Sequence, residues 1–423
     1  MKSNAIGTRD WVDANQAAAL LGVTKATLYA YVSRGKLGAA PGSTHATSLY
    51  RRSEVEGLVR QRSRARRPRE VARAALAWGL PVLESQLTLI ERQRLHYRGE
   101  LATGLAQRAS LEDVACLLWQ CTHDAAFGSV AAASASSGWR RALSGFAGLA
   151  PPDRMLAAFT VLQATVPAAG AEVDTRLLAR HAGSLLRLSC AAALGRSPTT
   201  AAVHLQFAEA WGLPARAADA VRAALVLSAD HELNASGFVA RCVASTGADL
   251  GKAVVGGLAA LSGGLHGGMT ARVEAMWDEL DRSASLRAGL ERRLARSDHV
   301  VGFGHPLYPD GDPRAAEILA RLPRGAVRNA AVRLAGHVEE LTGKRPSLDF
   351  ALVALRRAIG APEGGAYAVF AVGRTVGWLA HALEQRATGS LIRPRAAYTG
   401  VRPTGEPTPP PAPPARPSSM FAR

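Results

Sequence analysis

Apolar residues recur at every third or fourth position through residues 71–399, in one segment after another. The pattern is clear in ADLGKAVVGGLAALS, MTARVEAMWDELD, RAAEILARL and AVRNAAVRLAGHVEELTG. This spacing puts the apolar side chains on one face of an α-helix. SLEDVACLLWQ begins with the capping-box pair Ser110 and Asp113, which favours a helix start. Only RQRLHYRG, residues 92–99, shows weak strand alternation, so the sequence predicts an all-α main body.

The composition agrees with a helical globular chain. The 423 residues are 48% hydrophobic but only 5% aromatic. No apolar run reaches the roughly 18–20 residues of a membrane span, and MKSNAIGTRDWVDANQ lacks the apolar stretch of a secretion signal. We therefore expect a cytoplasmic protein. Its four cysteines form no CxxC pair and are expected to be buried free thiols: Cys116, Cys121, Cys190 and Cys242.

The N-terminal segment from WVDANQAAALLGVTKATLYAYVSRGKL predicts two short helices separated by a tight turn. Asp13 is expected to cap the first helix, and Thr24, after the turn GVT, is expected to cap the second. The first helix carries Ala17, Ala18, Leu20 and Leu21. The second buries Leu28 and Val32, which are four residues apart. Its outward-facing residues are expected to be Lys25, Thr27, Tyr31 and Arg34.

A hairpin rich in Gly, Pro and Ser is expected at residues 38–46, followed by a third short helix from Ser53. The whole pattern, ending in YRRSEVEGL, resembles the winged helix-turn-helix of MerR- and excisionase-type proteins. In those proteins the second helix enters the DNA major groove. The resemblance implies possible DNA contacts at Lys25, Thr27, Tyr31, Arg34, Arg51 and Arg52.

Charge and composition divide the chain further. Residues 1–70 hold 13 Lys and Arg against 5 Asp and Glu, within a net charge of +17. This surplus fits nucleic-acid contact, but the excess of arginine is equally explained by genomic base composition. The expected order is a winged helix-turn-helix domain at 1–59, a basic linker at 60–75, the helical body at 76–399 and a disordered Pro-rich tail at 400–423.

Three histidines lie in segments that do not read as ordinary helix interior. His231 stands at an expected helix start in SADHELNAS, and His266 lies between two glycine pairs in SGGLHGGM. His305 stands in GFGHPLYPDGDPRA, nine residues before Arg314. Each histidine taken alone is more often a satisfied surface or core residue.

A carboxylate follows in RPSLDF, where Asp349 stands in the first turn of a helix that Ser347 is expected to cap. An Asp at such a position is commonly a helix-dipole partner. No HxxxH, HxH or CxxC spacing indicates a metal site, and no G-x-S-x-G elbow, Walker lysine or G-x-G-x-x-G strand turn is present. Acid–base chemistry remains, with neutral histidines as donors, a carboxylate base and arginines for an anionic substrate.

Longer motifs carry a second resemblance. Over residues 85–399, the order and spacing of several motifs resemble those of the citrate synthase family. The motifs are DHELNAS, VASTGADLGKAVVGGLAALSGGLHGGM, GFGHPLYPDGDPRA, SLDFALVAL and AVGRTVGWLAHALEQRATGSLIRPRAAYTG. The resemblance implies an all-α fold in which a small domain, about 268–365, closes over the substrates. It also implies an acyltransferase of the tricarboxylic acid cycle that condenses acetyl-CoA with oxaloacetate and hydrolyses the thioester, with no cofactor or metal.

The same resemblance implies a role for individual residues. Asp349 would remove a proton from the acetyl group, while His266 donates a hydrogen bond to the thioester oxygen. His305 would donate to the ketone oxygen of oxaloacetate. The substrate-binding residues would be His231, Arg314, Arg374 and Arg393. In the family, the arginine that matches Arg393 reaches the neighbouring subunit's site, which implies a homodimer.

Departures from the family pattern keep other hypotheses open. PLYPDG carries no cation where the family often has one for the phosphates of CoA. Lys344 and Arg345 are candidates for that contact, or simply a solvated pair. A 2-methylcitrate synthase that uses propionyl-CoA is an alternative, because one methylene changes binding by only about 1–3 kcal/mol. Another is a DNA-binding regulator that senses oxaloacetate or CoA through an enzyme-like body.

Overall fold

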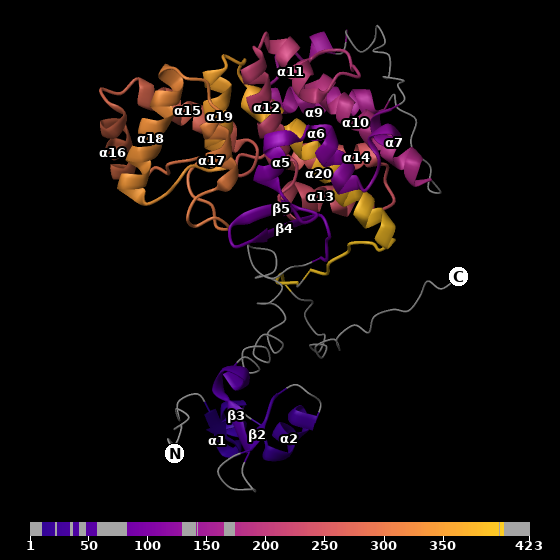
Figure 1. Ribbon diagram of the computed structural model, residues 1–423, viewed down its shortest axis with the longest axis vertical. Coiled ribbons are helices and arrows are strands. Elements are labelled where there is room, and N and C mark those ends of the chain that lie inside the picture. The colour runs from indigo at the N-terminus through magenta and orange to yellow at the C-terminus, as the bar shows by residue number, and fades with distance from the viewer. Residues whose placement is uncertain are drawn as a thin grey trace. The chain divides into compact units, whose positions relative to one another are not determined.

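The computed structural model divides the chain into two compact units (Figure 1). One comprises Met1–Val82 with Arg393–Arg423, and the other is Leu83–Ile392. The residues described are 11–21, 23–33, 37–41, 48–56, 83–128, 141, 143–164, 174–396 and 398–401. The expected linker at 60–75 and nearly all of the tail at 400–423 lie outside them.

In the first unit, two short helices accompany a small antiparallel sheet. The elements are β1 (Trp11–Asp13), α1 (Ala14–Leu21), α2 (Lys25–Ser33), β2 (Ala40–Pro41) and β3 (Ser48–Arg51). The strands lie in the order β1-β3-β2, and a helical turn follows at residues 52–56. Strand β1 was not expected, because three residues are too few for a recognisable alternation.

Both predicted helix caps in this unit are confirmed. The Asp13 carboxylate accepts the N–H of Gln16 at 2.8 Å, and the Thr24 hydroxyl accepts the N–H of Thr27 at 3.3 Å. Such bonds satisfy backbone donors that a helix leaves unpaired at its start. Leu28 is fully buried in the small core, as its spacing predicted.

Tyr31 corrects the expected outward face of α2. It packs against the small core together with Val32, because a residue three positions after Leu28 lies on the same helix face. Arg34 and residues 42–46 of the expected wing hairpin lie outside the described residues. Of the other proposed DNA contacts, Lys25, Arg51 and Arg52 are exposed and Thr27 is half-buried.

The second unit is almost entirely helical. It begins with β4 (Thr88–Glu91), β5 (Arg94–Tyr97) and β6 (Glu100–Leu101), which form an antiparallel sheet in that order. The helices are α5 (Ala102–Arg108), α6 (Leu111–Trp119), α7 (His123–Phe127), α9 (Pro151–Gln163), α10 (Thr175–Leu194), α11 (Val203–Trp211), α12 (Ala215–Ser228), α13 (Ala235–Ser245), α14 (Leu250–Leu261), α15 (Met269–Asp281), α16 (Leu286–Ala295), α17 (Pro313–Ala320), α18 (Ala326–Thr342), α19 (Leu348–Ala358) and α20 (Gly365–Thr388). The weak alternation at 92–99 therefore belongs to a real hairpin, and Ser110 and Asp113 form the predicted capping box.

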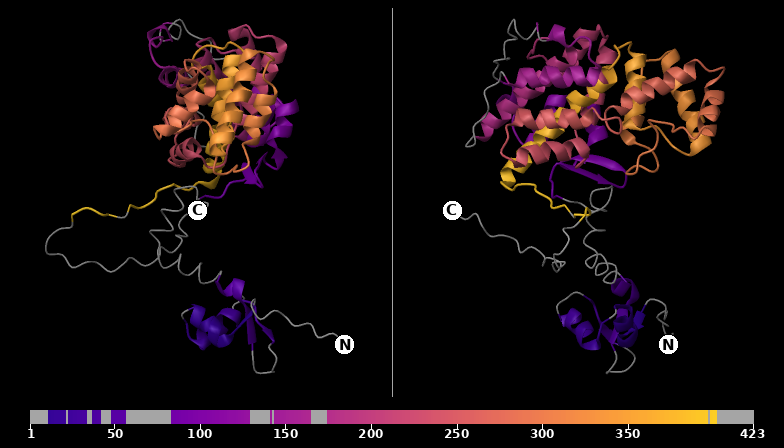
Figure 2. Two further views of the ribbon diagram at one scale, coloured as in Figure 1. Left: turned by 90° about the vertical axis from the view of Figure 1, so that its left-hand side faces the viewer. Right: turned by 180° about the vertical axis from the view of Figure 1, so that it is seen from behind.

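Helix α20 runs through the centre of the unit and is buried along most of its length (Figure 2). It packs on α6, α10, α12, α13 and α14. Its contact with the end of α12 is close, since the N–H of Gly377 donates to the carbonyl of Ala229 at 3.0 Å. A Cβ at Gly377 would lie 2.4 Å from that same oxygen, so only glycine fits.

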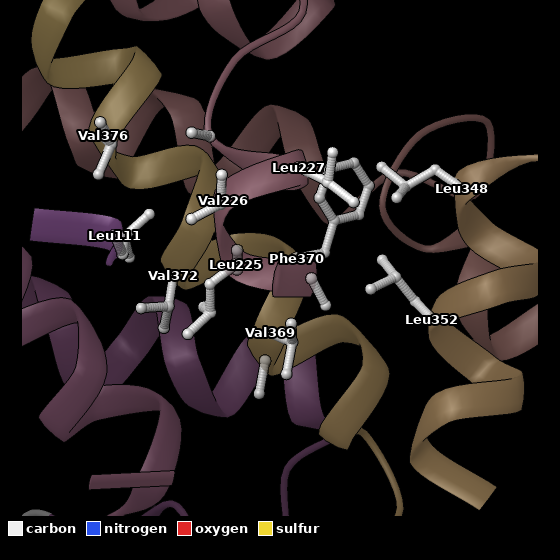
Figure 3. Packing of buried hydrophobic residues seen from close by; sticks show 14 of the residues in the cluster. Leu111, Leu225, Val226, Leu227, Leu348, Leu352, Val369, Phe370, Val372 and Val376 are labelled. Carbon is white, nitrogen blue, oxygen red and sulfur yellow. The ribbon is translucent and has the colours of Figure 1, made fainter. Parts of the chain in front are cut away.

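Helices α15 to α19 form a separate group beside this bundle, here called the α15–α19 lobe (Figure 1). Within it, α19 packs on α15, α17 and α18. Apolar side chains join the lobe to the bundle, as Figure 3 shows for Phe370 of α20, Leu227 of α12 and Leu348 and Leu352 of α19. The candidate site lies where these elements meet.

Two further expectations can be compared with this unit. Cys190 is buried, as expected, whereas Cys116, Cys121 and Cys242 are only partly buried. Cys116 and Cys121 still pack against the core, and Cys121 lies in the loop between α6 and α7. All four cysteines are free thiols.

Within the described part of the chain, no helix is both long enough and apolar enough to span a membrane.

Candidate active site

The loop between α12 and α13 brings His231 into the centre of the unit. Just before it, Asp230 is completely buried, accepts a hydrogen bond from the Thr88 hydroxyl and lies 3.3 Å from Nε2 of His381. Burial alone would raise the pKa of Asp230, but His381, Arg374 and the Thr88 hydroxyl together outweigh burial and the pKa is lowered. The loop thus rests on a buried polar pair. His231 precedes helix α13 by four residues rather than standing at its start, because Asn234 is the N-cap.

His231 and His305 form an edge-to-face pair with ring centroids 5.1 Å apart. Nε2 of His231 also lies 3.0 Å from the hydroxyl of Tyr308. On His305, Nδ1 accepts the N–H of Leu307 at 3.2 Å, so the neutral ring carries its proton on Nε2. Burial, followed by the charge of Arg314, lowers the pKa of His305 to about 4, and the ring is neutral at pH 7.

His266 lies in the glycine loop that joins α14 to α15. The backbone folds back tightly there, with the N–H of His266 bonded to the carbonyl of Gly263 at 2.9 Å. A Cβ at Gly268 would lie 2.6 Å from the carbonyl of Ser262, which explains the glycine. Burial and then the charge of Arg374 lower the pKa of His266 to about 4. This ring is also neutral at pH 7.

A buried hydroxyl holds one nitrogen of that ring. Oγ of Ser236 lies 2.8 Å from Nε2 of His266 and 2.8 Å from Oδ1 of Asn234. Asn234 also accepts the N–H of Gly237 at 3.1 Å, which identifies the atom as oxygen. The single proton of Ser236 can serve only one of its two acceptors at a time. When it is donated to His266, the neutral ring carries its own proton on Nδ1.

Two arginines supply buried positive charge. Arg314 is 3% exposed and binds Asp312 through two side-chain hydrogen bonds, of 2.9 and 2.7 Å. Asp312 also caps α17 and accepts the N–H of Leu348, so it joins the starts of α17 and α19. Burial would lower the pKa of Arg314, but Asp312 more than offsets this and raises it. The guanidinium is therefore fixed and charged.

Arg374 is 1% exposed, and its Nε donates to the carbonyl of Ser228 at 2.7 Å. Its guanidinium lies 5.0 Å from the ring centroid of Phe370. Among the described residues, its two Nη atoms have no hydrogen-bond partner. Burial lowers the pKa of Arg374 to about 10, so it remains charged at pH 7. A buried cation with open donors is suited to binding an anion.

Asp349 lies in the first turn of α19, as the sequence predicted. Ser347 holds the N-cap position, but its hydroxyl makes no capping bond and instead donates to Asp349 at 3.4 Å. The expected cap is therefore wrong, because the hydroxyl is directed toward the carboxylate. Burial raises the pKa of Asp349 to about 6, and the charge of Arg314 opposes the shift.

Six of the predicted site residues thus share one electrostatic environment: His231, His266, His305, Arg314, Asp349 and Arg374. Sequence reasoning missed Asp312, Tyr308, Ser236 and the Asp230–His381 pair. Asp312 and Tyr308 stand in the same GFGHPLYPDGDPRA segment as His305, which was the available signal. Ser236 and His381 are contacts between distant segments, and no local pattern indicates them.

The remaining predicted positions lie elsewhere. Arg393 is exposed and belongs to the other compact unit, so its contact across a dimer interface stays a prediction. Arg345 forms an ion pair with Glu339 at 2.7 Å. Lys344 is exposed, and the aliphatic part of its side chain lies beside Gly304. Across the described residues, His, Cys, Asp and Glu side chains form no group of three that could hold a metal ion.

Family models match both parts of the chain. Residues 75–395 match the model of the citrate synthase C-terminal domain, and residues 11–63 match a helix-turn-helix domain. Among curated proteins, putative citrate synthase 2 of Mycobacterium tuberculosis is 41% identical over 203 residues, which cover 44% of this chain and 52% of that protein. Citrate synthase 2 of Bacillus subtilis is 35% identical over 189 residues, with 43% and 51% covered.

A third relative carries a different name. The 2-methylcitrate synthase of Mycobacterium tuberculosis is 37% identical over 183 residues, which cover 42% of this chain and 47% of that protein. The chain therefore spans about half the length of the curated relatives it matches.

Solved structures share the fold. Citrate synthase from Thermotoga maritima superimposes with a TM-score of 0.58 at 24% identity, covering 78% of this chain and 96% of that one. Citrate synthase from Thermoplasma acidophilum, in a ternary complex with carboxymethyl coenzyme A and oxaloacetate, gives a TM-score of 0.63 at 24% identity, covering 77% and 95%. The likeness confirms the predicted all-α fold.

Proposed function

The chain belongs to the citrate synthase family, and on that premise we propose that it condenses acetyl-CoA with oxaloacetate and hydrolyses the product to citrate and CoA. The observation that carries the proposal is the pairing of a carboxyl of raised pKa with neutral histidines beside buried arginines. A thioester methyl group is a very weak acid. Its deprotonation needs a base and a hydrogen-bond donor to the developing enol oxygen at the same time.

Asp349 is the proposed base. With a pKa of about 6 it is mostly ionised at pH 7, yet more basic than an exposed carboxylate. His266 is the proposed donor to the thioester oxygen. Because its Nε2 faces Ser236, the donor is Nδ1, and this requires the Ser236 proton to be given to Nε2.

Oxaloacetate would lie near His305 and the arginines. The proton on Nε2 of His305 is suited to the ketone oxygen, which gains negative charge as the carbon–carbon bond forms. The open Nη atoms of Arg374 and the fixed charge of Arg314 would bind the carboxylates, and His231 would contact the same substrate. Arg393 of a second subunit is proposed to complete the site in a homodimer.

Two structural expectations accompany this mechanism. We propose that residues of about 268–365, which include the α15–α19 lobe, close over the bound substrates and exclude water. For the phosphates of CoA, Lys344 is the better candidate, since its side chain is exposed whereas Arg345 is paired with Glu339.

The test is CoA release from acetyl-CoA and, in parallel, propionyl-CoA, each with oxaloacetate. Asp349→Ala serves as the inactive control. Turnover that disappears in this variant supports the proposal, and the ratio of the two rates separates citrate from 2-methylcitrate synthesis. The second activity is a real alternative because one relative is named 2-methylcitrate synthase. A folded protein that binds oxaloacetate but releases no CoA from either thioester would contradict both.

A second function is favoured by the N-terminal unit. Residues 11–63 match a helix-turn-helix domain, and Lys25, Arg51 and Arg52 are exposed there. We propose that this unit binds DNA, with the helical body acting as a sensor of oxaloacetate or CoA. Binding to duplex DNA with and without oxaloacetate tests this function independently of turnover.

A further inference from the structure

The hairpin β4–β5 ends in an unfavourable turn. Glu91 pairs with Arg94, which leaves Arg92 and Gln93 as a two-residue loop. Their φ angles are 49° and 60°, in the left-handed region. Hairpin turns of this kind strongly prefer Asn-Gly, because a side chain is strained there. A long polar residue in such a turn therefore calls for a compensating contact.

Gln93 makes that contact through both ends of its amide. Its Nε2 donates to Oδ2 of Asp310, and its Oε1 accepts the N–H of Asp310 at 2.8 Å. The first bond involves a charged carboxylate, which makes it stronger than a neutral one. Gln93 is half-buried and Asp310 is exposed, so this Gln93–Asp310 clasp lies at the surface.

Asp310 belongs to the segment that carries His305. Backbone bonds from Tyr308 to His305 at 2.9 Å and from Gly311 to Tyr308 at 3.0 Å make the segment two successive turns. The carbonyl of Asp310 also accepts a hydrogen bond from Arg345 at 2.6 Å. These backbone bonds connect Asp310 to His305 through two turns.

The same hairpin also holds the segment that carries His231. The Thr88 hydroxyl donates to Asp230, and the N–H of Ile90 donates to the Glu232 carboxylate at 3.2 Å. Glu232 is itself left-handed, with φ of 50°. One hairpin is thus bonded to both histidine segments, to the His231 segment through β4 and to the His305 segment through its turn.

We propose that Gln93 is a positioning residue, which fixes His305 relative to His231 by clamping Asp310. The inference rests on the proposed function, in which both histidines act on oxaloacetate. The two hydrogen bonds of the Gln93 side chain both go to Asp310, so the proposed effect on His305 passes through Asp310. Loss of the clasp would misplace the donor of His305 and lower the rate of condensation more than it weakens the binding of the thioester.

The test exchanges the hydrogen-bond donor, the amide of Gln93, with the acceptor, the carboxylate of Asp310. Gln93→Glu keeps the shape of the side chain but puts a carboxylate against Asp310. We expect kcat to fall roughly tenfold or more, with KM for the thioester and the melting temperature close to those of the wild type. Gln93→Glu combined with Asp310→Asn restores a donor opposite an acceptor, and kcat is expected to recover to within about threefold of the wild type. Glu91→Gln, on the same hairpin, is the control with unchanged kinetics.

The outcomes separate this inference from the proposed function. A single variant with wild-type kcat, or a double variant as slow as the single one, overturns the clasp. A wild-type protein that releases no CoA contradicts the proposed function instead. The clasp is then tested by the ring ¹⁵N signals of His305, which should shift in Gln93→Glu and return in the double variant. Signals that stay unchanged overturn the clasp in that case too.

Discussion

The hydroxyl of Ser236 lies 2.8 Å from Nε2 of His266, and it has a second acceptor at the same distance in Asn234. The direction of one proton therefore decides which nitrogen of the neutral imidazole is the donor. Asn234 keeps the N–H of Gly237 in either case, so giving the proton to His266 leaves no buried acceptor without a partner.

Replacing Ser236 with alanine removes this control over the tautomer. We expect Ser236→Ala to lower kcat for CoA release roughly 10- to 100-fold, with KM for oxaloacetate nearly unchanged, because the arginines are untouched. Solvent exchange of the acyl hydrogens, measured by NMR, should slow in parallel. Ser245→Ala on the same helix is the control. Exchange at the wild-type rate in Ser236→Ala would contradict the tautomer argument.

The pH dependence of activity should reflect two kinds of group. Asp349 must be ionised, and its raised pKa of about 6 predicts that kcat/KM falls as the pH decreases below about 6. His266 and His305 must be neutral, and their lowered pKa values of about 4 keep them neutral across that range. The acid limb should therefore show a single proton until the pH approaches 4. An acid limb that falls with more than one proton above pH 5 would contradict the assignment to Asp349 alone.

Asp349 should also weaken the fold at neutral pH. Its pKa is raised from 3.8 in the unfolded chain to about 6 in the folded one, so the ionised form is disfavoured by folding. The resulting loss of stability develops as the pH rises from about 4 to 6. Asp349→Asn should then increase the free energy of unfolding at pH 7 by up to about 3 kcal/mol, with no gain at pH 3.5. Denaturant melts at the two pH values test this, and an equal effect at both would contradict it.

Arg374 should be needed for its shape as well as its charge. Lysine keeps the positive charge, but its three N–H donors share one nitrogen and cannot replace a planar fork that bonds to Ser228 through Nε and presents separate Nη donors. We expect Arg374→Lys to raise KM for oxaloacetate roughly 10- to 100-fold. Arg386→Lys, further along the same helix, should leave KM unchanged. Calorimetric titration with oxaloacetate gives the same comparison without turnover, and equal affinities in the wild type and Arg374→Lys would exclude the role.

The sequence correctly predicted those structural features that depend on residues close together in the chain. Helix periodicity, the capping box at Ser110 and the caps at Asp13 and Thr24 depend on neighbours within four residues. The Ser347 cap failed because the orientation of its hydroxyl depends on Asp349 and on how α19 is packed. The motifs identified the site residues through the family resemblance. The contact between Ser236 and His266, by contrast, joins residues 30 positions apart. No spacing in a single sequence encodes such a pairing.

DNA binding by the N-terminal unit has a specific electrostatic signature. Lys25 begins α2 and is exposed, and Arg52 is exposed and lies 3.8 Å from the carboxylate of Glu56. If both contact phosphates, Lys25→Ala and Arg52→Ala should each reduce the slope of log affinity against log salt by about 1. Lys252→Ala, an exposed lysine of the helical body, is the matched control.

The same titrations should be repeated with oxaloacetate. An affinity for DNA that changes with oxaloacetate, and loses that change in Arg374→Lys, would link the anion site to the N-terminal unit. By linkage, DNA must then change the affinity for oxaloacetate by the same factor, which calorimetry can check. Equal salt slopes for the wild type, Lys25→Ala and Arg52→Ala would contradict DNA contact through this face. The helix-turn-helix would then serve another purpose, such as contact with a protein.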